Sequence, residues 1–280
     1  MSSMPVQTDL ARKLKLFRQE SPKAYLRNVA ADLGSSEAEL LPLEEKTTRL
    51  QNVEGLFQEL AALEKQTTIT RNDFAVHELT GRITVETLDE KNIVLSIGQS
   101  KVNIHRDLIA VIYLVEKEGR NSVQLYDGYG DSVVKFFLKD AALEPFFQFK
   151  HGEEPLKTFK KPGATGIQID IKTKLAQRAT RKLIEGLAKT DQQISVQVSS
   201  FGCDQYFTGK IERVVDARGW FNILDPDFNL HLKEEKCTDV YLLNDQSISA
   251  TDGHREIVKL YFDSGAIKDE ALTQILRGEK

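Results

Sequence analysis

Apolar and polar residues alternate along several short stretches in two separate parts of the chain. Residues 207–215 (FTGKIERVV), 237–243 (CTDVYLL) and 255–262 (REIVKLYF) are rich in β-branched and aromatic residues. This composition, together with the partial alternation, is typical of strands. Asp-Gly pairs at 127–128 and 252–253 predict tight turns that join neighbouring strands.

Two longer stretches have a helical period instead. Apolar residues recur at every third or fourth position in 51–65 and again in 173–189, which predicts one helix before each group of strands. With helices and strands segregated in this way, the chain is expected to be an α+β protein whose strands are antiparallel and whose helices pack on one face of each sheet.

A further helical module is predicted at the N-terminal end. Residues 21–34 (SPKAYLRNVAADLG) would form a helix that Ser21 begins and Gly34 ends. Ser36 and Glu39 then have the spacing of a capping box at the start of the next helix. This part resembles a helix-turn-helix, but its second helix is acidic, whereas a helix that enters a DNA groove needs Lys or Arg. We therefore expect simple helix packing here.

The strand-rich region occurs twice. Five segments match in the same order and at nearly constant spacing, which indicates a duplicated domain. The matching pairs are 79–83 (LTGRI) with 207–211 (FTGKI), 92–95 (NIVL) with 222–224 (NIL), 102–105 (VNIH) with 228–231 (FNLH), 111–115 with 239–243, and 122–137 with 247–262.

The duplication divides the chain into three parts. We expect a first repeat in 1–150, which includes the N-terminal helices, a linker in 151–172, and a second repeat in 173–280 with a short C-terminal helix. Prolines and glycines between His151 and Gly166 support the linker. Each repeat is predicted to be an antiparallel sheet unit flanked by helices.

Composition limits the function classes. The net charge of -4 gives no overall bias toward nucleic acids or anionic membranes. No apolar run approaches the length of a spanning helix, and the N-terminus has no signal-peptide pattern. Two cysteines, Cys203 and Cys237, form neither a disulfide framework nor a metal motif. The sequence predicts a cytoplasmic protein that is not embedded in a membrane.

Enzyme motifs do not stand out. There is no GxSxG, P-loop, GxGxxG or HExxH sequence, so hydrolase, nucleotide and zinc sites are not indicated. His105 and His231 occupy equivalent repeat positions, although duplication would copy a structural histidine in the same way. A basic stretch in 157–182 leaves a nucleic-acid adaptor as a minor alternative, while a solvated helix face explains it equally simply.

Several strings in both halves resemble one family. The segments "TRNDFAVHE" from residue 70 and "GWFNILDPDFNLHL" from residue 219 resemble the HemS-type hemin-degrading and heme-trafficking proteins, which are duplicated in the same way. The second half is also similar to single-repeat heme-utilisation carriers of the ChuX/HutX type. The resemblance implies binding of heme that an inner-membrane transporter delivers, followed by storage, hand-over or oxidative opening.

The chain also departs from this family pattern. The helical module that carries the iron-ligating histidine in the second repeat is missing. The basic residue that faces heme from the first repeat aligns near Lys101 or Val102. An Arg-Lys-Pro stretch is replaced by 243–247 (LNDQS). The resemblance therefore implies a retained scaffold with a changed ligand shell.

Heme requires an apolar slot, basic partners for its propionates and an axial ligand for iron. No other metal is expected. A structural histidine or a structural salt bridge remains the alternative for every candidate. The iron candidates are His151, His105 and His231, with Tyr129 and His254 as weaker ones; the propionate candidates are Arg71, Lys101, Arg106, Arg178 and Arg181.

The sequence thus predicts a cytoplasmic heme-binding protein of heme uptake and iron acquisition. Carriage is the first expectation and degradation with an external reductant is the second. The alternative is an interaction or regulatory protein that keeps the duplicated scaffold without heme. Expected partners are heme and an inner-membrane heme transporter or a heme acceptor protein, with no nucleic acid; the oligomeric state is left open.

Overall fold

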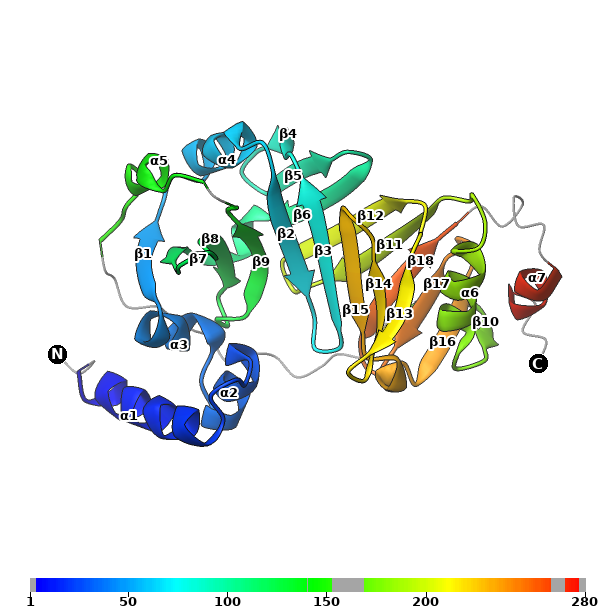
Figure 1. Ribbon diagram of the computed structural model, residues 1–280, viewed down its shortest axis with the longest axis horizontal. Helices are drawn as coiled ribbons and strands as arrows, with labels where there is room; N and C mark the ends of the chain where they lie inside the picture. Colours follow the sequence, from blue (N-terminus) through cyan, green and yellow to red (C-terminus); the bar gives the residue numbers. More distant parts are fainter. Residues whose placement is uncertain (1–3, 140, 153–168, 263–269, 277–280) are drawn as a thin grey trace.

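The computed structural model describes residues 4–139, 141–152, 169–262 and 270–276 (Figure 1). Strands β1 to β9 and β10 to β18 follow one another in the same order in the two repeats, with a helix after the first strand of each. The predicted duplicated, antiparallel α+β fold is confirmed.

The elements of the first repeat are α1 (Met4–Glu20), α2 (Leu26–Leu33), α3 (Glu37–Glu44), β1 (Lys46–Leu50), α4 (Val53–Ala62), β2 (Gln66–Arg71), β3 (Ala75–Gly81), β4 (Thr84–Leu88), β5 (Asn92–Ile97), β6 (Ser100–His105), the 3-10 helix η1 (Arg106–Leu108), β7 (Ile109–Glu116), β8 (Ser122–Asp127), β9 (Ser132–Phe137) and α5 (Glu144–Phe147).

The second repeat lacks a described counterpart of the first three helices. It contains β10 (Ile171–Leu175), α6 (Ala179–Leu187), β11 (Ile194–Ser199), β12 (Cys203–Gly209), β13 (Val214–Ala217), β14 (Trp220–Leu224), β15 (Phe228–Leu232), η2 (Glu234–Lys236), β16 (Asp239–Leu243), β17 (Ile248–Thr251), β18 (Glu256–Tyr261) and α7 (Glu270–Leu276). The predicted linker 151–172 falls largely on residues outside the described ones, and its last two residues begin β10. The repeat boundaries stay a prediction.

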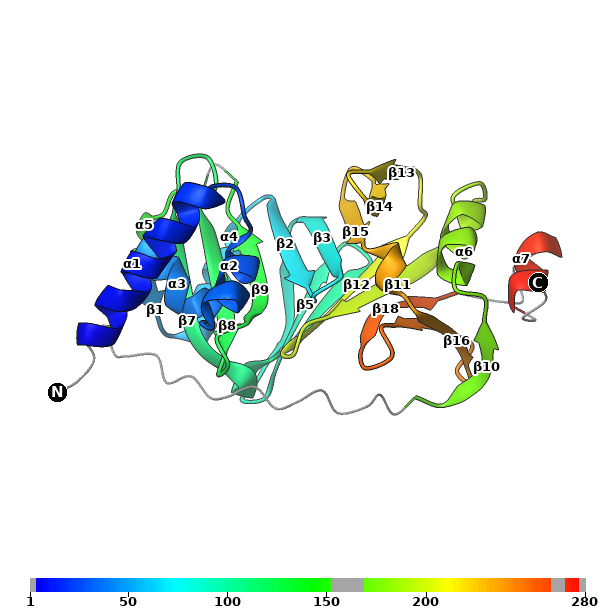
Figure 2. The same ribbon diagram turned by 90° about the horizontal axis from the view of Figure 1, so that it is seen from below.

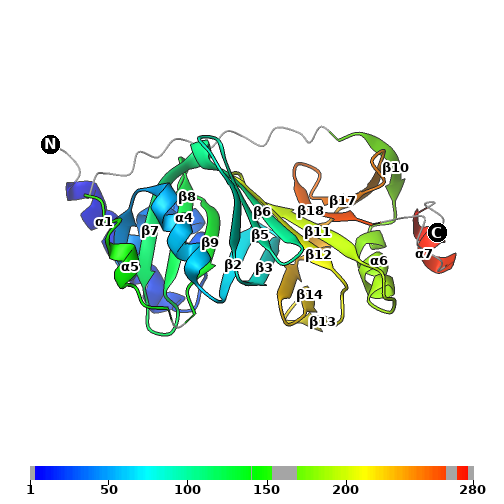
Figure 3. The ribbon, with the colours of Figure 1, turned by 90° about the horizontal axis from the view of Figure 1, so that it is seen from above.

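The repeats exchange strands. One nine-stranded sheet has the order β1-β7-β8-β9-β2-β3-β15-β14-β13, and the other has β10-β16-β17-β18-β11-β12-β6-β5-β4. Each sheet therefore takes six strands from one repeat and three from the other. Figure 3 shows β5 and β6 continuing the sheet of β11 and β12. An unpaired strand edge at β3 or β12 would invite aggregation, and the exchanged strands fill both edges.

Helices cover both faces of the first sheet (Figure 2). Alternate residues of β7 point in opposite directions, so Ile112 and Leu114 join the main core with α4. Val111, Tyr113 and Val115 pack under α3. The expectation that helices lie on one face of each sheet is therefore wrong for the first sheet, because the run 111–115 is apolar on both of its sides.

Two helix boundaries differ from the predicted ones. Residues 171–175 form a strand that pairs with β16, so the helix predicted over 173–189 begins only at Ala179. Helix α2 begins after Tyr25 rather than at Ser21, and it ends at Gly34 with φ of 62° as predicted. The predicted capping box between Ser36 and Glu39 is also confirmed.

A buried polar group joins the two sheets where β2 and β3 face β11 and β12. His77 is fully buried; its Nδ1 accepts a hydrogen bond from Gln205 Nε2 (2.8 Å) and its Nε2 donates to the Val196 carbonyl (3.1 Å). Gln205 Nε2 also donates to the Thr68 carbonyl (3.1 Å), and Gln205 Oε1 accepts from Thr70 (3.0 Å). Burial lowers the pKa of His77 to about 3, so the ring is neutral.

We predict that protonation of His77 weakens the fold at mildly acidic pH. The folded-state pKa lies below the unfolded value of about 6.5, so the stabilisation is complete above that value and is lost as pH falls toward 3. His77→Gln should be less stable than wild type at pH 7, and this gap should narrow by about 2 kcal/mol at pH 5. Urea unfolding at both pH values measures this difference in stability, and His231→Gln, at a half-buried histidine, is the control. A difference that does not change with pH would contradict the prediction.

Candidate functional site

One face of the second sheet is not covered by any helix among the described residues. Helix α6 packs on the opposite face through Leu183, Ile184 and Leu187. The equivalent face of the first sheet is apolar and lies under α3. In the second sheet, the residues that match Val111, Tyr113 and Tyr126 of the first sheet are Asp239, Tyr241 and Thr251. We call this uncovered surface the open face.

Strand alternation and register decide which side chains the open face carries. Gln197 of β11 is opposite both Tyr206 and Lys259, and Asp204 of β12 is opposite Asn103 of the exchanged strand β6. The side chains on this face include Lys101, Asn103, His105, Ser195, Gln197, Ser199, Asp204, Tyr206, Thr208, Asp239, Tyr241, Ser249, Thr251, Glu256, Lys259 and Tyr261.

A polar strip crosses four strands of this face. His105 Nε2 lies 3.8 Å from Asp204 Oδ2. Asp204 Oδ1 accepts a hydrogen bond from Gln197 Nε2 (3.2 Å), and Gln197 Oε1 accepts one from the Tyr261 hydroxyl (2.7 Å). Lys259 Nζ lies 4.9 Å from the centre of the Tyr261 ring. The strip therefore links a histidine, a carboxylate, a phenol and an ammonium group.

Tyrosines supply flat surface beside this strip. The rings of Tyr206 and Tyr261 lie 6.4 Å apart. Burial, followed by the negative charge of Asp204, raises the pKa of Tyr206, so its hydroxyl stays protonated and can donate a hydrogen bond. Burial also raises the pKa of Tyr261.

Of the three main iron candidates, His105 is on the open face. Its side chain is 47% exposed and has a carboxylate beside one ring nitrogen, an arrangement that often orients histidine ligands of metals. His231 lies on β15 in the other sheet, where Nδ1 contacts Asn222 Oδ1 (2.7 Å) and Nε2 lies 3.9 Å from Glu78. His151 lies beside β1, and its backbone N–H donates to the Arg49 carbonyl (2.9 Å). The structure does not bring these histidines together.

The basic candidates are also dispersed. Lys101 is exposed on the open face, opposite Tyr206. Arg106 is turned toward α4, where it binds Glu54 (2.7 Å) and the Asp89 carbonyl (2.9 Å).

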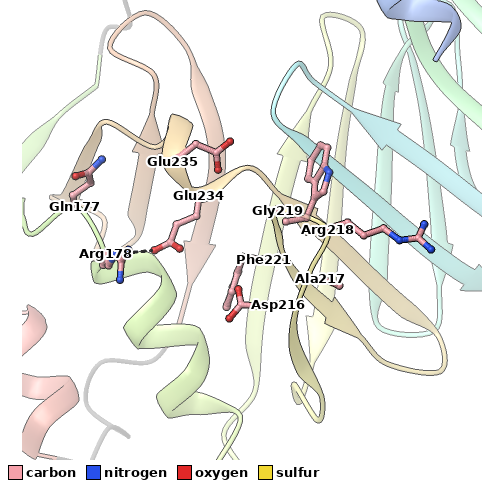
Figure 4. A pocket seen from close by; sticks show the side chains of 10 residues that line it. Gln177, Arg178, Asp216, Ala217, Arg218, Gly219, Phe221, Glu234 and Glu235 are labelled. Atoms are coloured by element: carbon pink, nitrogen blue, oxygen red, sulfur yellow. Dashed lines mark ion pairs between the residues drawn. The ribbon is translucent and has the colours of Figure 1, made fainter. Parts of the chain in front are cut away.

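Arg178 and Arg181 lie beside a cavity of about 490 Å³ between α6, the β13–β14 turn and η2 (Figure 4). Arg181 binds Glu185 (2.8 Å) and Glu234 (3.1 Å), and its guanidinium lies 4.9 Å from the Phe221 ring. Arg178 lies 3.8 Å from Glu234. Because carboxylates neutralise both arginines, this cavity is poorly suited to heme propionates.

A second cavity, of about 430 Å³, lies between the repeats and is called the inter-repeat cavity. Arg71 and His254 line it, together with Phe74 and Phe201. The Tyr129 ring packs against Phe201, with 5.3 Å between the ring centres. This cavity therefore contains or adjoins one basic candidate and the two weaker iron candidates.

The comparisons with known proteins agree with the duplicated architecture. The family model described as "Haemin-degrading HemS.ChuX domain" matches residues 34–150 and again residues 163–268. The chain belongs to this family. It is 25% identical over 279 residues to the hemin transport protein HemS of Yersinia enterocolitica, with 80% of this chain and 81% of that protein covered.

Two solved structures share the fold. The heme degrading enzyme ChuS of Escherichia coli O157:H7 superimposes with a TM-score of 0.81 at 21% identity, covering 98% of this chain and 99% of that one. Holo-PhuS, a heme-binding protein from Pseudomonas aeruginosa, has a TM-score of 0.79 at 22% identity, with the same coverage. In the part of the chain that the structure describes, no helix is both long and apolar enough to cross a membrane.

Sequence reasoning missed most of the polar strip. Asp204, Gln197, Tyr261 and Lys259 were not among the candidates, although the alternation in 194–199 (ISVQVS) and 255–262 signals a polar strand face. That signal does not reveal which strands are neighbours. Only the pairing of β12 with β6 places His105 beside Asp204.

We predict that Arg181 is mainly structural. It joins α6 to η2 and to the hairpin that contains Phe221, so Arg181→Ala should lower the free energy of unfolding by about 1–2 kcal/mol. Arg178→Ala is the matched control and should change it by less than about 0.5 kcal/mol, since that side chain is mostly exposed. Urea unfolding distinguishes the two, and equal losses would refute the difference in role.

Proposed function

We propose that the protein binds heme on the open face and carries it in the cytoplasm during heme uptake and iron acquisition. Membership of the HemS/ChuX family and the similarity to proteins described as heme-binding support a heme-related role. The observation that carries the proposal is the juxtaposition of His105 and Asp204 on a sheet face that also bears Lys101 and the neighbouring rings of Tyr206 and Tyr261.

The residues of the open face fit the chemical demands of heme. His105 would bind the iron, while Asp204 lies beside one ring nitrogen and would hold the ring orientation. Lys101 would pair with a propionate. Tyr206 and Tyr261 offer ring surface for the macrocycle and protonated hydroxyls for its polar edge. Heme would contribute the iron and its redox chemistry.

Carriage is favoured over degradation. His105 is half-exposed and is the histidine on this face, which suits a ligand that must be taken up and released. Heme degradation is the less favoured function, because it needs firmly held iron and an external reductant. An inner-membrane heme transporter would be the donor, and a heme acceptor protein would be the recipient.

A heme-free interaction protein is the alternative. One observation favours it: polar groups of the open face already have partners within the protein, since Lys259 binds Asp245 (3.1 Å) and Glu256 accepts a hydrogen bond from Ser249 (2.6 Å). Such a face would be stable without a ligand. A hemin titration separates the two functions directly.

We predict saturable one-to-one hemin binding, seen as a shift of the Soret band. His105→Ala should weaken it by about tenfold or more, since the axial ligand is lost. Lys101→Ala should weaken it by roughly twofold to fivefold, because an exposed ion pair contributes about 0.2–1 kcal/mol. Addition of a reductant then tests for loss of the Soret band through degradation.

His231→Ala and His151→Ala are the matched controls and should bind hemin like wild type. If one of them lost binding while His105→Ala kept it, the open-face assignment would be wrong. If wild type shifted the Soret band no more than a non-binding control protein does, the heme-free function would replace carriage.

A further inference from the structure

The inter-repeat cavity lies between equivalent turns of the two repeats. The β2–β3 turn and its counterpart, the β11–β12 turn, form two of its walls, and the β8–β9 and β17–β18 turns form the others. The cavity, of about 430 Å³, is within the size range of small-molecule sites. It adjoins the open face, with which it shares Ser199 and Glu256, but the proposed iron ligand His105 is not part of its lining.

The two copies have diverged at this place. Arg71, Asn72 and Asp73 of the first repeat correspond to Ser199, Ser200 and Phe201 of the second. Asn72 Nδ2 donates to the Ile257 carbonyl (2.8 Å) and so fixes one wall to the other repeat. At these three positions the first repeat supplies two charged groups and an amide, and the second supplies two hydroxyls and an aromatic ring.

Arg71 is the unexplained group in this cavity. Its Nε is buried without a hydrogen-bond partner, and its side chain makes no ion pair with the residues that the structure describes. Burial lowers its pKa, and Glu37 opposes this lowering most strongly. That carboxylate is already held by Lys135 at 2.9 Å. A buried N–H without a hydrogen-bond acceptor is costly, so a ligand that accepts from the Arg71 guanidinium would relieve this cost.

The carboxylates that line the cavity have partners other than Arg71. Arg27 and Arg255 both bind Asp73, the latter at 2.7 Å; Arg27 also lies 3.9 Å from Glu37, and Arg255 lies 3.7 Å from Asp252. The remaining carboxylates of the cavity are engaged elsewhere. Asp252 accepts hydrogen bonds from the backbone N–H groups of His254 and Arg255, and Glu256 accepts one from the Ser249 hydroxyl. Against the lowering by burial, the negative charges of Asp73, Glu37 and Asp131 raise the pKa of Arg27.

We propose that the inter-repeat cavity binds a small organic anion, a carboxylate or a phosphate monoester with an apolar group, through the guanidinium of Arg71. The arginine fork matches two oxygens of such an anion. Phe74 and Phe201 line the same cavity and would contact the apolar group. Because the walls belong to both repeats, an occupant would also hold the repeats together.

The experiment measures binding of benzoate, phenyl phosphate and inorganic phosphate by calorimetry and by the shift in thermal unfolding. Wild type, Arg71→Gln and the control Arg213→Gln, an exposed arginine, are compared in low-chloride buffer. Wild type and the control should bind benzoate or phenyl phosphate, and Arg71→Gln should bind about tenfold or more weakly. Preference for phenyl phosphate or benzoate identifies the acid group, and tighter binding than that of inorganic phosphate confirms the apolar contact.

The unliganded variants give an independent readout. Without anion, Arg71→Gln should unfold at a temperature no lower than wild type, because a partly buried cation whose Nε has no hydrogen-bond partner is removed. The proposal is overturned if wild type binds none of the probes at up to roughly 10 mM, or if Arg71→Gln loses stability without any change in anion binding.

A hemin titration of Arg71→Gln separates this site from the proposed function. Unchanged hemin affinity in this variant, with loss in His105→Ala, supports two distinct sites. Hemin affinity that depends on Arg71 and not on His105 would mean that the cavity receives heme itself, and it would overturn the separate anion site. If wild type did not bind hemin, the proposed carriage would be refuted, and the anion measurement would be unaffected.

Discussion

The neutral imidazole of His77 between the two sheets is the contact on which the rest of the architecture depends. A polar ring buried in an apolar interface is tolerated only if both nitrogens find partners. Gln205 and Val196 provide them, and both belong to the other repeat. These hydrogen bonds join the two sheets inside their shared core. The turns of the two repeats meet around the inter-repeat cavity, and backbone pairing holds the exchanged strands in register.

Strand exchange makes the open face a joint product of both repeats. The exchanged strand β6 carries Lys101 and His105 into the second sheet, where Asp204 of β12 is their neighbour. A single repeat could not assemble this arrangement, because its own β6 is not beside its own β3 in the sheet order. Duplication therefore does more than double a domain: it places first-repeat side chains on the face where the second repeat lacks a helical cover among the described residues.

The conformation of each segment was largely predictable from the sequence, whereas the pairing of strands that are distant in sequence was not. Alternation, Asp-Gly turns and repeated segments report the conformation of each stretch, and they indicated the duplicated antiparallel fold. These sequence signals do not indicate which sheet edge a strand joins, since residues 92–105 could form backbone hydrogen bonds at the edge of either sheet. The same limit applies to the site. His105 was recognised from its repeat position, but Asp204 and Tyr261 become its neighbours only through pairing. The basic residues Arg178 and Arg181 looked available because their shared acidic partner Glu234 is distant in sequence, although Glu185 lies only four residues after Arg181.

The two copies of this sheet face illustrate how a lost cover changes a sequence. In the first repeat, Val111, Tyr113 and Tyr126 are buried under α3. Left uncovered, such a face would expose a contiguous apolar patch. The second repeat has Asp239 and Thr251 at two of these places, and its long polar side chains hydrogen-bond one another across the strands. This polar surface keeps the tyrosine rings accessible from solvent without a helix above them. The same substitutions that make the missing cover tolerable therefore also create the surface on which a flat, charged ligand could be held.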